Sequence, residues 1–265
     1  MTSVCVGNDV VDLEHPRTAG RADDERFVTR VLDAEERQAV RASDERDLEL
    51  WCHWAAKEAG YKVISKLTGD PPPFVHRAFK VAWSDGPEGP DIDLVTDPVV
   101  SQPSPGAPLA VLAPIIRRGS VSWQGRRARV SVALLPGGIH AVASAAREPS
   151  EDAVDVRSRV ELLDTPATPW AGSLPELLAR LTGREADAVY SLASAAVRVG
   201  ARGDLAELMG VTERRVEIVC GPGRSGRRPP RVLLDGGPIE ADVSLSHDGR
   251  LIAWATWVGR RQGAS

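Results

Sequence analysis

The segment from Asp44 to Gly69 constrains the fold most, because it has the pattern of one long amphipathic helix. Small or apolar side chains recur every three or four residues, which predicts a buried stripe. The stripe consists of Leu48, Cys52, Ala55, Ala59 and Val63. Gly69, followed by three prolines, predicts the end of the helix. The opposite face carries larger and charged residues that either meet solvent or form a site: Trp54, Lys57, Glu58, Tyr61 and Lys62.

Composition narrows the class of protein. The chain has 265 residues, 42% hydrophobic and 26% charged, which is typical of one large or two smaller soluble domains. A net charge of -4 argues against a dedicated nucleic-acid binder. The three cysteines, widely spaced, favour neither a disulfide framework nor a zinc site and suggest a reducing cytoplasm. We find no export signal and no apolar run long enough for a membrane span.

The first part of the chain predicts a strand followed by helices. Ser3 to Leu13 alternates apolar and small or polar residues, as a strand does, and places Asp9 and Asp12 at or just past its end. An acidic residue in that place is either a turn former or a ligand. Two short helices follow within residues 23–42, the second with Asp33 as N-cap and Glu36 as its capping-box partner.

Downstream of the long helix, the pattern predicts further strands and a second helical region. Strands are expected over 74–83 and, after a surface excursion over 85–113, over 120–146. Residues 149–170 are polar and rich in proline and are expected to link two halves. Helices are expected after Ser173 and over 185–208, with Gly210 as the stop. The last strands are expected over 214–219, 231–235, 241–246 and 251–258.

Two stretches resemble each other, which predicts two related halves. Residues 121–143 and 232–255 both read as three strands joined by glycine turns. We therefore expect an α+β fold with a pseudo-twofold pair of halves, 1–148 and 171–265, each with a small antiparallel sheet and packed helices. His247 has no counterpart in the first copy, and the second half has no counterpart of Lys57 and Glu58. One composite site at the seam is expected.

The residues at that seam suit phosphate chemistry. Asp9 and Glu58 could hold a magnesium ion, which takes few carboxylates and shares its other positions with water and phosphate. Lys57 and Lys62 would flank the ion and neutralise phosphate charge, and His247 would add a donor. This set fits a magnesium-bound pyrophosphate better than a nucleophile-base-acid triad.

Three motifs give the chain a resemblance to the 4'-phosphopantetheinyl transferases. They are Val6-Gly7-Asn8-Asp9-Val10-Val11-Asp12, Trp54-x-x-Lys57-Glu58-Ala59-x-x-Lys62 and Val243-Ser244-Leu245-Ser246-His247. The Asp strand and Lys-Glu helix come first, as in the small trimeric holo-acyl-carrier-protein-synthase branch, whereas the chain has the length of the monomeric branch. The resemblance therefore implies a permuted pseudodimer, self-sufficient as a monomer.

The resemblance also implies residue roles. Asp9 and Glu58 would be Mg²⁺ ligands, and Glu58 or a metal-bound water would be the base for the attacking serine. Lys57 and Lys62 would meet the pyrophosphate of coenzyme A, with Lys62 counted as catalytic, and His247 would meet its 3'-phosphate. Val11 stands where the monomeric branch has a second acidic ligand, so water or Asp12 would complete the shell. Weaker candidates for the adenosine phosphates are Arg198, Arg202, Arg227 and Arg228.

The implied reaction transfers the 4'-phosphopantetheine arm of coenzyme A to a serine of an apo carrier protein and releases 3',5'-ADP. The carrier, which presents an acidic helix, would need a basic or apolar rim near the seam, and it could serve fatty acid, polyketide or nonribosomal peptide synthesis. Two other readings stay open. One is a non-catalytic module that binds coenzyme A or carrier protein, and the other is an unrelated magnesium-dependent phosphohydrolase.

Overall fold

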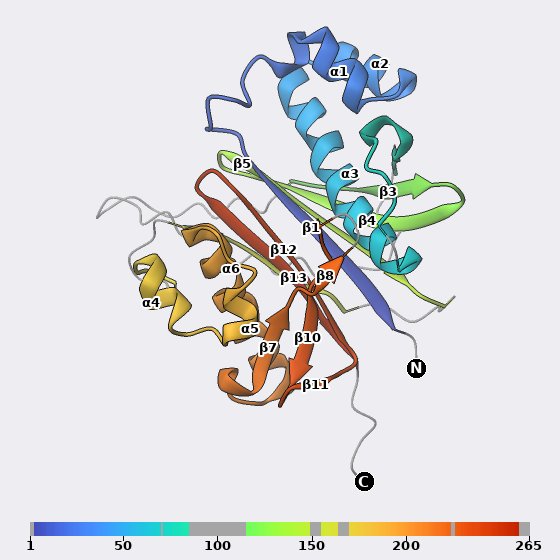
Figure 1. Ribbon diagram of the computed structural model, residues 1–265. Coiled ribbons are helices and arrows are strands. Elements are labelled where there is room, and N and C mark those ends of the chain that lie inside the picture. The colour runs from blue at the N-terminus through green and yellow to red at the C-terminus, as the bar shows by residue number, and fades with distance from the viewer. Residues whose placement is uncertain are drawn as a thin grey trace.

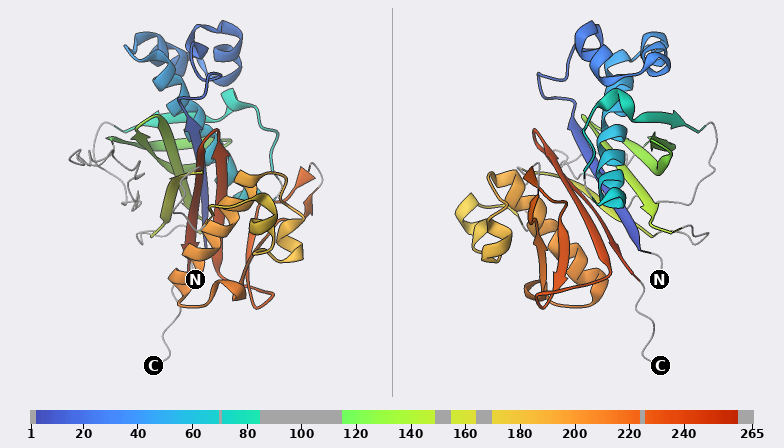
Figure 2. Two further views of the ribbon diagram at one scale, coloured as in Figure 1. Left: turned by 90° about the vertical axis from the view of Figure 1, so that its left-hand side faces the viewer. Right: turned by 45° about the vertical axis from the view of Figure 1, so that its right-hand side comes forward.

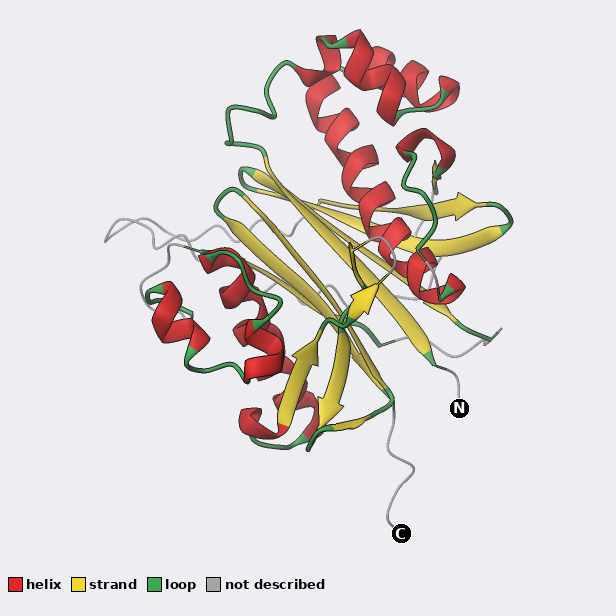
Figure 3. Ribbon diagram, in the orientation of Figure 1, coloured by secondary structure: helices red, strands yellow, loops and turns green. Residues whose placement is uncertain are grey.

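The computed structural model describes residues 3–69, 71–84, 115–148, 155–163, 170–223 and 226–259. Helices and antiparallel strands form separate runs along the chain, so the fold is α+β, as predicted (Figure 1 and Figure 3). The excursion expected over 85–113 lies outside the described residues. Among the described helices, none is long and apolar enough to cross a membrane.

The first half is built on a sheet with the strand order β1-β5-β4-β3-β2, in which every neighbouring pair is antiparallel. The long helix packs on one face of this sheet, and two short helices cover its N-terminal end (Figure 1). The strands are β1 (Val4–Asp12), β2 (Lys80–Trp83), β3 (Ile115–Trp123), β4 (Arg126–Leu135) and β5 (Gly138–Ala146). The helices are α1 (Glu25–Val31), α2 (Ala34–Ala42) and α3 (Arg46–Thr68), with 3-10 turns η1 (Arg21–Asp23) and η2 (His76–Ala78).

Helix α3 approaches the sheet closely because its packed face is made of small residues. Ala55 and Ala59 are completely buried, and a Cβ at Gly7 of β1 would collide with the carbonyl oxygen of Ala59. The helix ends where the sequence predicts, with Gly69 in the left-handed conformation at φ 76°. The capping box of Asp33 and Glu36 is also present at the start of α2.

The second half contains two three-stranded sheets, ordered β12-β13-β6 and β11-β10-β7, and the two-stranded pair β8-β9, with α6 packed against β13 and β12. Figure 2 shows α6 on the side of these strands that faces away from the first half. The strands are β6 (Arg157–Leu162), β7 (Val216–Val219), β8 (Pro222–Gly223), β9 (Gly226–Arg227), β10 (Arg231–Leu234), β11 (Gly237–Pro238), β12 (Ala241–Asp248) and β13 (Leu251–Val258). The helical elements are α4 (Leu174–Leu178), α5 (Gly183–Ala186), α6 (Leu192–Met209) and the turn η3 (Glu213–Arg215).

Three details differ from the sequence prediction. The strand expected over 74–83 forms only over Lys80–Trp83, because the chain after the prolines first makes the turn η2. Strand β6 lies inside the segment expected as a linker and pairs with β13. The repeat holds for the hairpins β4–β5 and β12–β13, but β10 pairs with β7 and β11, whereas β3 pairs with β4.

The halves meet along a ladder between β1 and side chains of β12. Strand β1 is an edge strand, and its outward backbone amides would be unpaired if nothing covered them. Alternate residues of β12 supply the acceptors, each 236 positions from its donor, so β12 runs parallel to β1 here. The contacts are Val6 N to Asp242 Oδ2 (2.7 Å), Asn8 N to Ser244 Oγ (2.9 Å), Val10 N to Ser246 Oγ (3.3 Å) and Asp12 N to Asp248 Oδ2 (3.0 Å).

Lys66 of α3 closes the same seam from the helix side. Its buried ammonium donates to the carbonyl oxygens of Val6 (2.8 Å) and Val243 (2.7 Å) and to Asp242 Oδ2 (2.9 Å). One lysine therefore joins α3, β1 and β12, and it neutralises the carboxylate at one end of the ladder.

Replacing Lys66 with methionine should destabilise the protein by about 3 kcal/mol, because a buried carboxylate and two carbonyls lose their partner. The matched variant is Lys62→Met, one helical turn earlier, whose partly exposed side chain lets water take over its contacts. We expect that variant to lose about 1 kcal/mol or less. Urea unfolding of both variants measures the difference, and equal losses would contradict the role given to Lys66.

A second prediction concerns His140 of β5, which is completely buried opposite Val10. Burial, and then the charge of Lys62, lower the pKa of His140 to about 3. The ring is therefore neutral in the folded protein, while the unfolded chain takes up a proton below about pH 6.5. Its contribution to stability is complete above that pH and is lost progressively as the pH falls from 6.5 towards 3.

When the pH is lowered from 7.5 to 4.5, His140 should lower the free energy of unfolding by about 2 to 3 kcal/mol. The His140→Leu variant lacks the titrating ring, so its free energy of unfolding should fall by that much less than the wild type's over the same range. Urea unfolding at both pH values gives the two slopes. Parallel slopes would show that His140 is not held neutral by the fold.

Candidate functional site

A pocket of about 450 Å³ lies beside Asp9, and we call it the Asp9 pocket. It is lined by Asp9 and Val10 of β1, Glu58 of α3 and His247 of β12, so it spans the seam. Asp9 itself is nearly buried. Its Oδ1 accepts a hydrogen bond from Ser246 Oγ at 2.9 Å and lies 3.1 Å from Lys62 Nζ.

Electrostatics make Asp9 an unusual carboxylate. Burial, together with the negative charge of Glu58, raises the pKa of Asp9 to about 6, although Lys62 and the Ser246 hydroxyl oppose the shift. Burial is the larger cause, and repulsion between the Asp9 and Glu58 carboxylates adds to it. A cation placed between them would relieve that repulsion.

Glu58 lies in the same pocket with an imidazole beside it. Glu58 Oε1 is 3.3 Å from His76 Nε2, and both side chains are mostly buried. The His76 ring stacks on Trp54, with centroids 4.3 Å apart. Glu58 therefore shares the pocket with Asp9 and lies next to the turn η2.

A second pocket of about 390 Å³, which we call the Arg198 pocket, opens on the other side of His247. It is rich in positive charge. Its lining includes Lys62 and Lys66 of α3, Arg198 of α6 and Arg228 before β10, together with His247. A pocket with this lining suits a ligand that carries several phosphate groups.

The Arg198 side chain is buried and fixed by its own helix. Its Nη1 donates to Ser194 O at 2.8 Å and to Ser194 Oγ at 2.9 Å. Arg228 is exposed, and its backbone amide donates to Gly221 O. The two arginines thus offer this pocket one buried and one exposed cation.

His247 links the two pockets, because it lines both. Partial burial and then the charges of Lys62 and Arg198 lower the pKa of His247. The positive charges of Lys62 and Arg198, which disfavour protonation of His247, would favour an anion bound beside it. Asp9, Glu58, Lys62 and His247 are therefore brought together at one seam, as the sequence predicts.

Lys57, by contrast, does not lie where the sequence places it. Its side chain is completely buried on the far side of α3 and lies in neither pocket. Its Nζ is 2.5 Å from Glu36 Oε2 and 3.0 Å from Val31 O. The expected contact with a pyrophosphate is wrong, because α1 and α2 cover this part of the helix face.

Arg202 is a second correction. It is buried one turn beyond Arg198 and bound to protein groups: its Nη1 to Arg180 O (2.6 Å) and Glu185 Oε2 (3.3 Å), and its Nη2 to Glu213 O (2.9 Å). These contacts anchor the loops around α6 and leave Arg202 outside the Arg198 pocket. The side chain of Arg227 lies outside the described residues.

Asp12 is likewise engaged elsewhere. Arg250 Nε and Nη2 donate to its two carboxylate oxygens at 3.0 and 2.8 Å, and Asp12 does not line the Asp9 pocket. The pocket is lined by the carboxylates of Asp9, Glu58 and Asp248, and the last of these is already paired with Arg17.

Several residues of the site escaped sequence reasoning. Arg17, Arg21 and Arg30 line the Asp9 pocket, so that its mouth is basic. His76, which lies beside Glu58, belongs to none of the three motifs. Arg17 and Arg21 could have been predicted from their place in the chain. The segment that directly follows β1 must pass the end of the strand that carries Asp9.

The donor set can be tested against a magnesium ion. No group of three or more His, Cys, Asp or Glu side chains suited to a metal occurs in the part of the chain that the structure describes. Magnesium does not need one, since it commonly uses one or two carboxylates and completes its octahedron with water and phosphate oxygens. Within the same residues, both side-chain hydrogen bonds accepted by Asp9 end on Oδ1. Oδ2 and the Glu58 carboxylate, which repel each other's charge, fit such an ion.

Carboxylates facing a pocket of basic side chains define a site for chemistry on a phosphate-bearing substrate. The family model of the 4'-phosphopantetheinyl transferase superfamily matches residues 5–89. This stretch, which carries Asp9, Glu58 and Lys62, is therefore a domain of that superfamily, and the resemblance drawn from the motifs is confirmed. His247 lies outside the matched residues. None of the curated proteins matches the chain.

Proposed function

We propose that the protein transfers the 4'-phosphopantetheine arm of coenzyme A to a serine of an apo carrier protein and releases 3',5'-ADP, with Mg²⁺ as its metal. One observation carries the proposal. His247 from β12 lines both the pocket that holds Asp9 and Glu58 and the pocket that holds Lys62 and Arg198. Carboxylates for a metal and cations for a polyphosphate thus adjoin in one site.

The proposal includes a permuted pseudodimer. The strand orders β1-β5-β4 and β6-β13-β12 correspond, and a long helix packs on each, α3 in one half and α6 in the other. Both sides of the seam come from one chain, so a monomer would be sufficient. We also propose a cytoplasmic location, in keeping with three free cysteines.

Coenzyme A would bind in the Arg198 pocket. The buried Arg198 and the exposed Arg228 would meet phosphates of the adenosine end, and His247 would meet the 3'-phosphate. Tyr61 and Tyr190 line the same pocket and offer ring faces for a base. The pyrophosphate would then reach from this pocket past Lys62 towards Asp9.

Asp9 and Glu58 would hold the magnesium ion, which supplies Lewis-acid polarisation of the pyrophosphate when bound. The chain's own residues do the remaining work. Lys62 is anchored by Asn8 O at 2.6 Å and brings a fixed positive charge beside Asp9. That charge would offset negative charge that grows on the pyrophosphate during transfer.

The transfer forms a bond between the carrier serine oxygen and the phosphorus nearest the pantetheine. The bond from that phosphorus to the oxygen of 3',5'-ADP breaks, and the leaving group takes the electron pair. Glu58, which lines the pocket, or a water on the metal would receive the serine proton. Positioning and charge stabilisation account for most of the catalysis in such chemistry.

The carrier protein would approach over the mouth of the Asp9 pocket. Arg17, Arg21 and Arg30 line that mouth, which therefore suits an acidic helix. Arg17 pairs with Asp248, and Arg21 lies 3.4 Å from Asp24, so each already has a single acidic partner. A carrier helix would exchange or share these contacts and bring its serine to Glu58.

The proposal is tested by intact-mass analysis of several apo carrier proteins incubated with the protein, coenzyme A and Mg²⁺. We expect a gain of about 340 Da, the mass of the arm added in a metal-assisted transfer. Glu58→Gln and His247→Ala should lower the initial rate by about a hundredfold or more, because each removes a group that meets the reacting phosphates or proton. Chelation of Mg²⁺ should abolish the gain, and its return should restore it.

The matched control is Glu35→Gln, which removes an exposed carboxylate from the first turn of α2 and should leave the rate unchanged. Coenzyme A binding without a mass gain on any carrier would instead identify a non-catalytic binding module. Phosphate release from coenzyme A in the absence of carrier would identify a phosphohydrolase.

A further inference from the structure

The turn η2 carries a histidine that no part of the proposed reaction uses. After the prolines that follow α3, the chain folds back across this helix, and the turn places His76 over Trp54 and Glu58. Ring centroids of His76 lie 4.3 Å from Trp54 and 4.0 Å from Phe74. With two aromatic neighbours, the imidazole has little freedom to turn.

The edge of this ring faces Glu58. His76 Nε2 is 3.3 Å from Glu58 Oε1, and the side chains are only 17% and 22% exposed. A glutamate side chain loses substantial rotamer freedom when it is held in one place, so a fixed partner matters for its geometry. At this distance the two groups are not aligned for a hydrogen bond, and His76 Nε2 has no hydrogen-bond partner among the described residues. A small rotation of the Glu58 carboxylate would let an imidazole with a proton on Nε2 donate to it and select that orientation.

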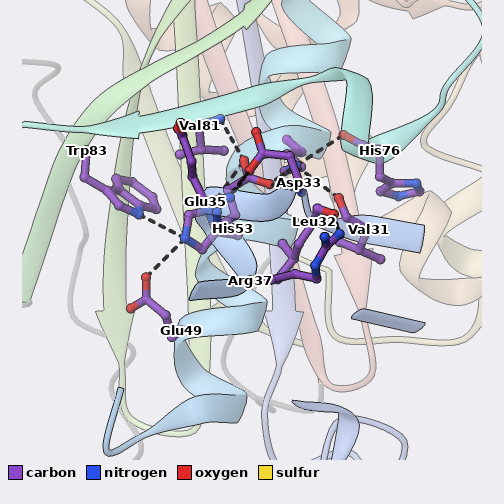
Figure 4. Close-up of polar contacts among 12 residues, drawn as sticks. Val31, Leu32, Asp33, Glu35, Arg37, Glu49, His53, His76, Val81 and Trp83 are labelled. Atoms are coloured by element: carbon purple, nitrogen blue, oxygen red, sulfur yellow. Dashed lines mark hydrogen bonds and ion pairs between the residues drawn. The ribbon is translucent and has the colours of Figure 1, made fainter. Parts of the chain in front are cut away.

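The buried Lys57–Glu36 pair fixes the turn itself. Lys57 Nζ donates to the backbone oxygen of His76 at 3.3 Å, as well as to Val31 O at the end of α1. Glu36 Oε1 in turn accepts the backbone amide of Val81 at 2.9 Å, which anchors β2 just after the turn. Figure 4 shows how His76, Val31 and Val81 converge on this network from three separate segments.

We propose that His76 is a positioning residue for Glu58, and that the Lys57–Glu36 pair holds His76 in place. The inference rests on the proposed function, because it concerns the orientation of the carboxylate that would receive the serine proton. It also gives the lysine of the Lys-Glu motif a role without contact to coenzyme A. Lys57 acts on the site through the backbone of His76.

Two substitutions separate positioning from packing. His76→Phe keeps an aromatic ring against Trp54 and Phe74 but removes the nitrogen that faces Glu58. His76→Gln keeps a donor at a similar place and gives up the ring. If His76 orients Glu58, His76→Phe should lower kcat by about ten- to a hundredfold, as small misplacements of a reacting group do. KM for coenzyme A should change less than twofold, and His76→Gln should recover part of the rate.

A second readout needs neither coenzyme A nor carrier protein. In protein labelled with ¹⁵N-histidine, the ring signals of His76, assigned by their loss in His76→Phe, should shift when Glu58 is replaced by glutamine. The signals of His53, which is buried on the same helix near Glu49, serve as the control and should stay in place.

The outcomes are distinguishable. Transfer by the wild type together with an unchanged kcat in His76→Phe would overturn the positioning role and leave the proposed function standing. Ring chemical shifts of His76 that stay the same in Glu58→Gln would overturn the positioning role as well. Absence of transfer by the wild type would overturn the proposed function, and with it this role, whatever the ring signals show. A third outcome would also overturn the positioning role. If His76→Phe lowers both the rate and the melting temperature, and His76→Gln recovers none of the rate, His76 serves only in packing.

Discussion

The structure depends on how the outward edge of β1 is satisfied. An edge strand inside a molecule cannot leave its amides unpaired, and here side-chain oxygens of β12, rather than a backbone, accept them. Because the acceptors stand at alternate residues, the two strands are fixed in register, and a shift by one residue would turn every acceptor away. The same register places Ser246 on Asp9 and His247 between the two pockets. The ladder that joins the halves is therefore also what assembles the site.

This arrangement makes the seam polar and charged rather than apolar. Lys62 and Lys66 approach β1 from α3 and donate to the carbonyl oxygens of Asn8 and Val6, the residues whose amides take part in the ladder. Buried charge is costly unless it is paired, so each lysine has an aspartate beside it. Asp9 keeps a raised pKa because burial and Glu58 outweigh its lysine. The groups that hold the halves together therefore also line the candidate site.

Much of this could be predicted from the sequence where the signal was local. Helix α3, its glycine stop and the capping box of α2 follow from short-range rules, and the convergence of Asp9, Glu58, Lys62 and His247 followed from motifs on three elements. The failures have one cause. A helical pattern tells which residues share a face but not which neighbour covers it, so Lys57 and Arg202 resembled site residues until α1, α2 and the loops around α6 covered them. The arginines of the Asp9 pocket were missed for another reason: Arg17 and Arg21 follow β1 in a segment without a periodic pattern, and Arg30 lies on the short helix α1.

The match to the superfamily ends at residue 89, but the matched stretch packs against later parts of the chain and shares its pockets with them. The matched stretch brings Asp9, Glu58 and Lys62, but the acceptors for its exposed strand edge and the histidine that borders both pockets come from β12. Without β12, the amides of β1 would face solvent, Lys66 would lose Asp242, and the Arg198 pocket would have no second wall. The same contacts between β1 and β12 thus determine both stability and site geometry. A change that breaks these contacts is expected to affect both properties together.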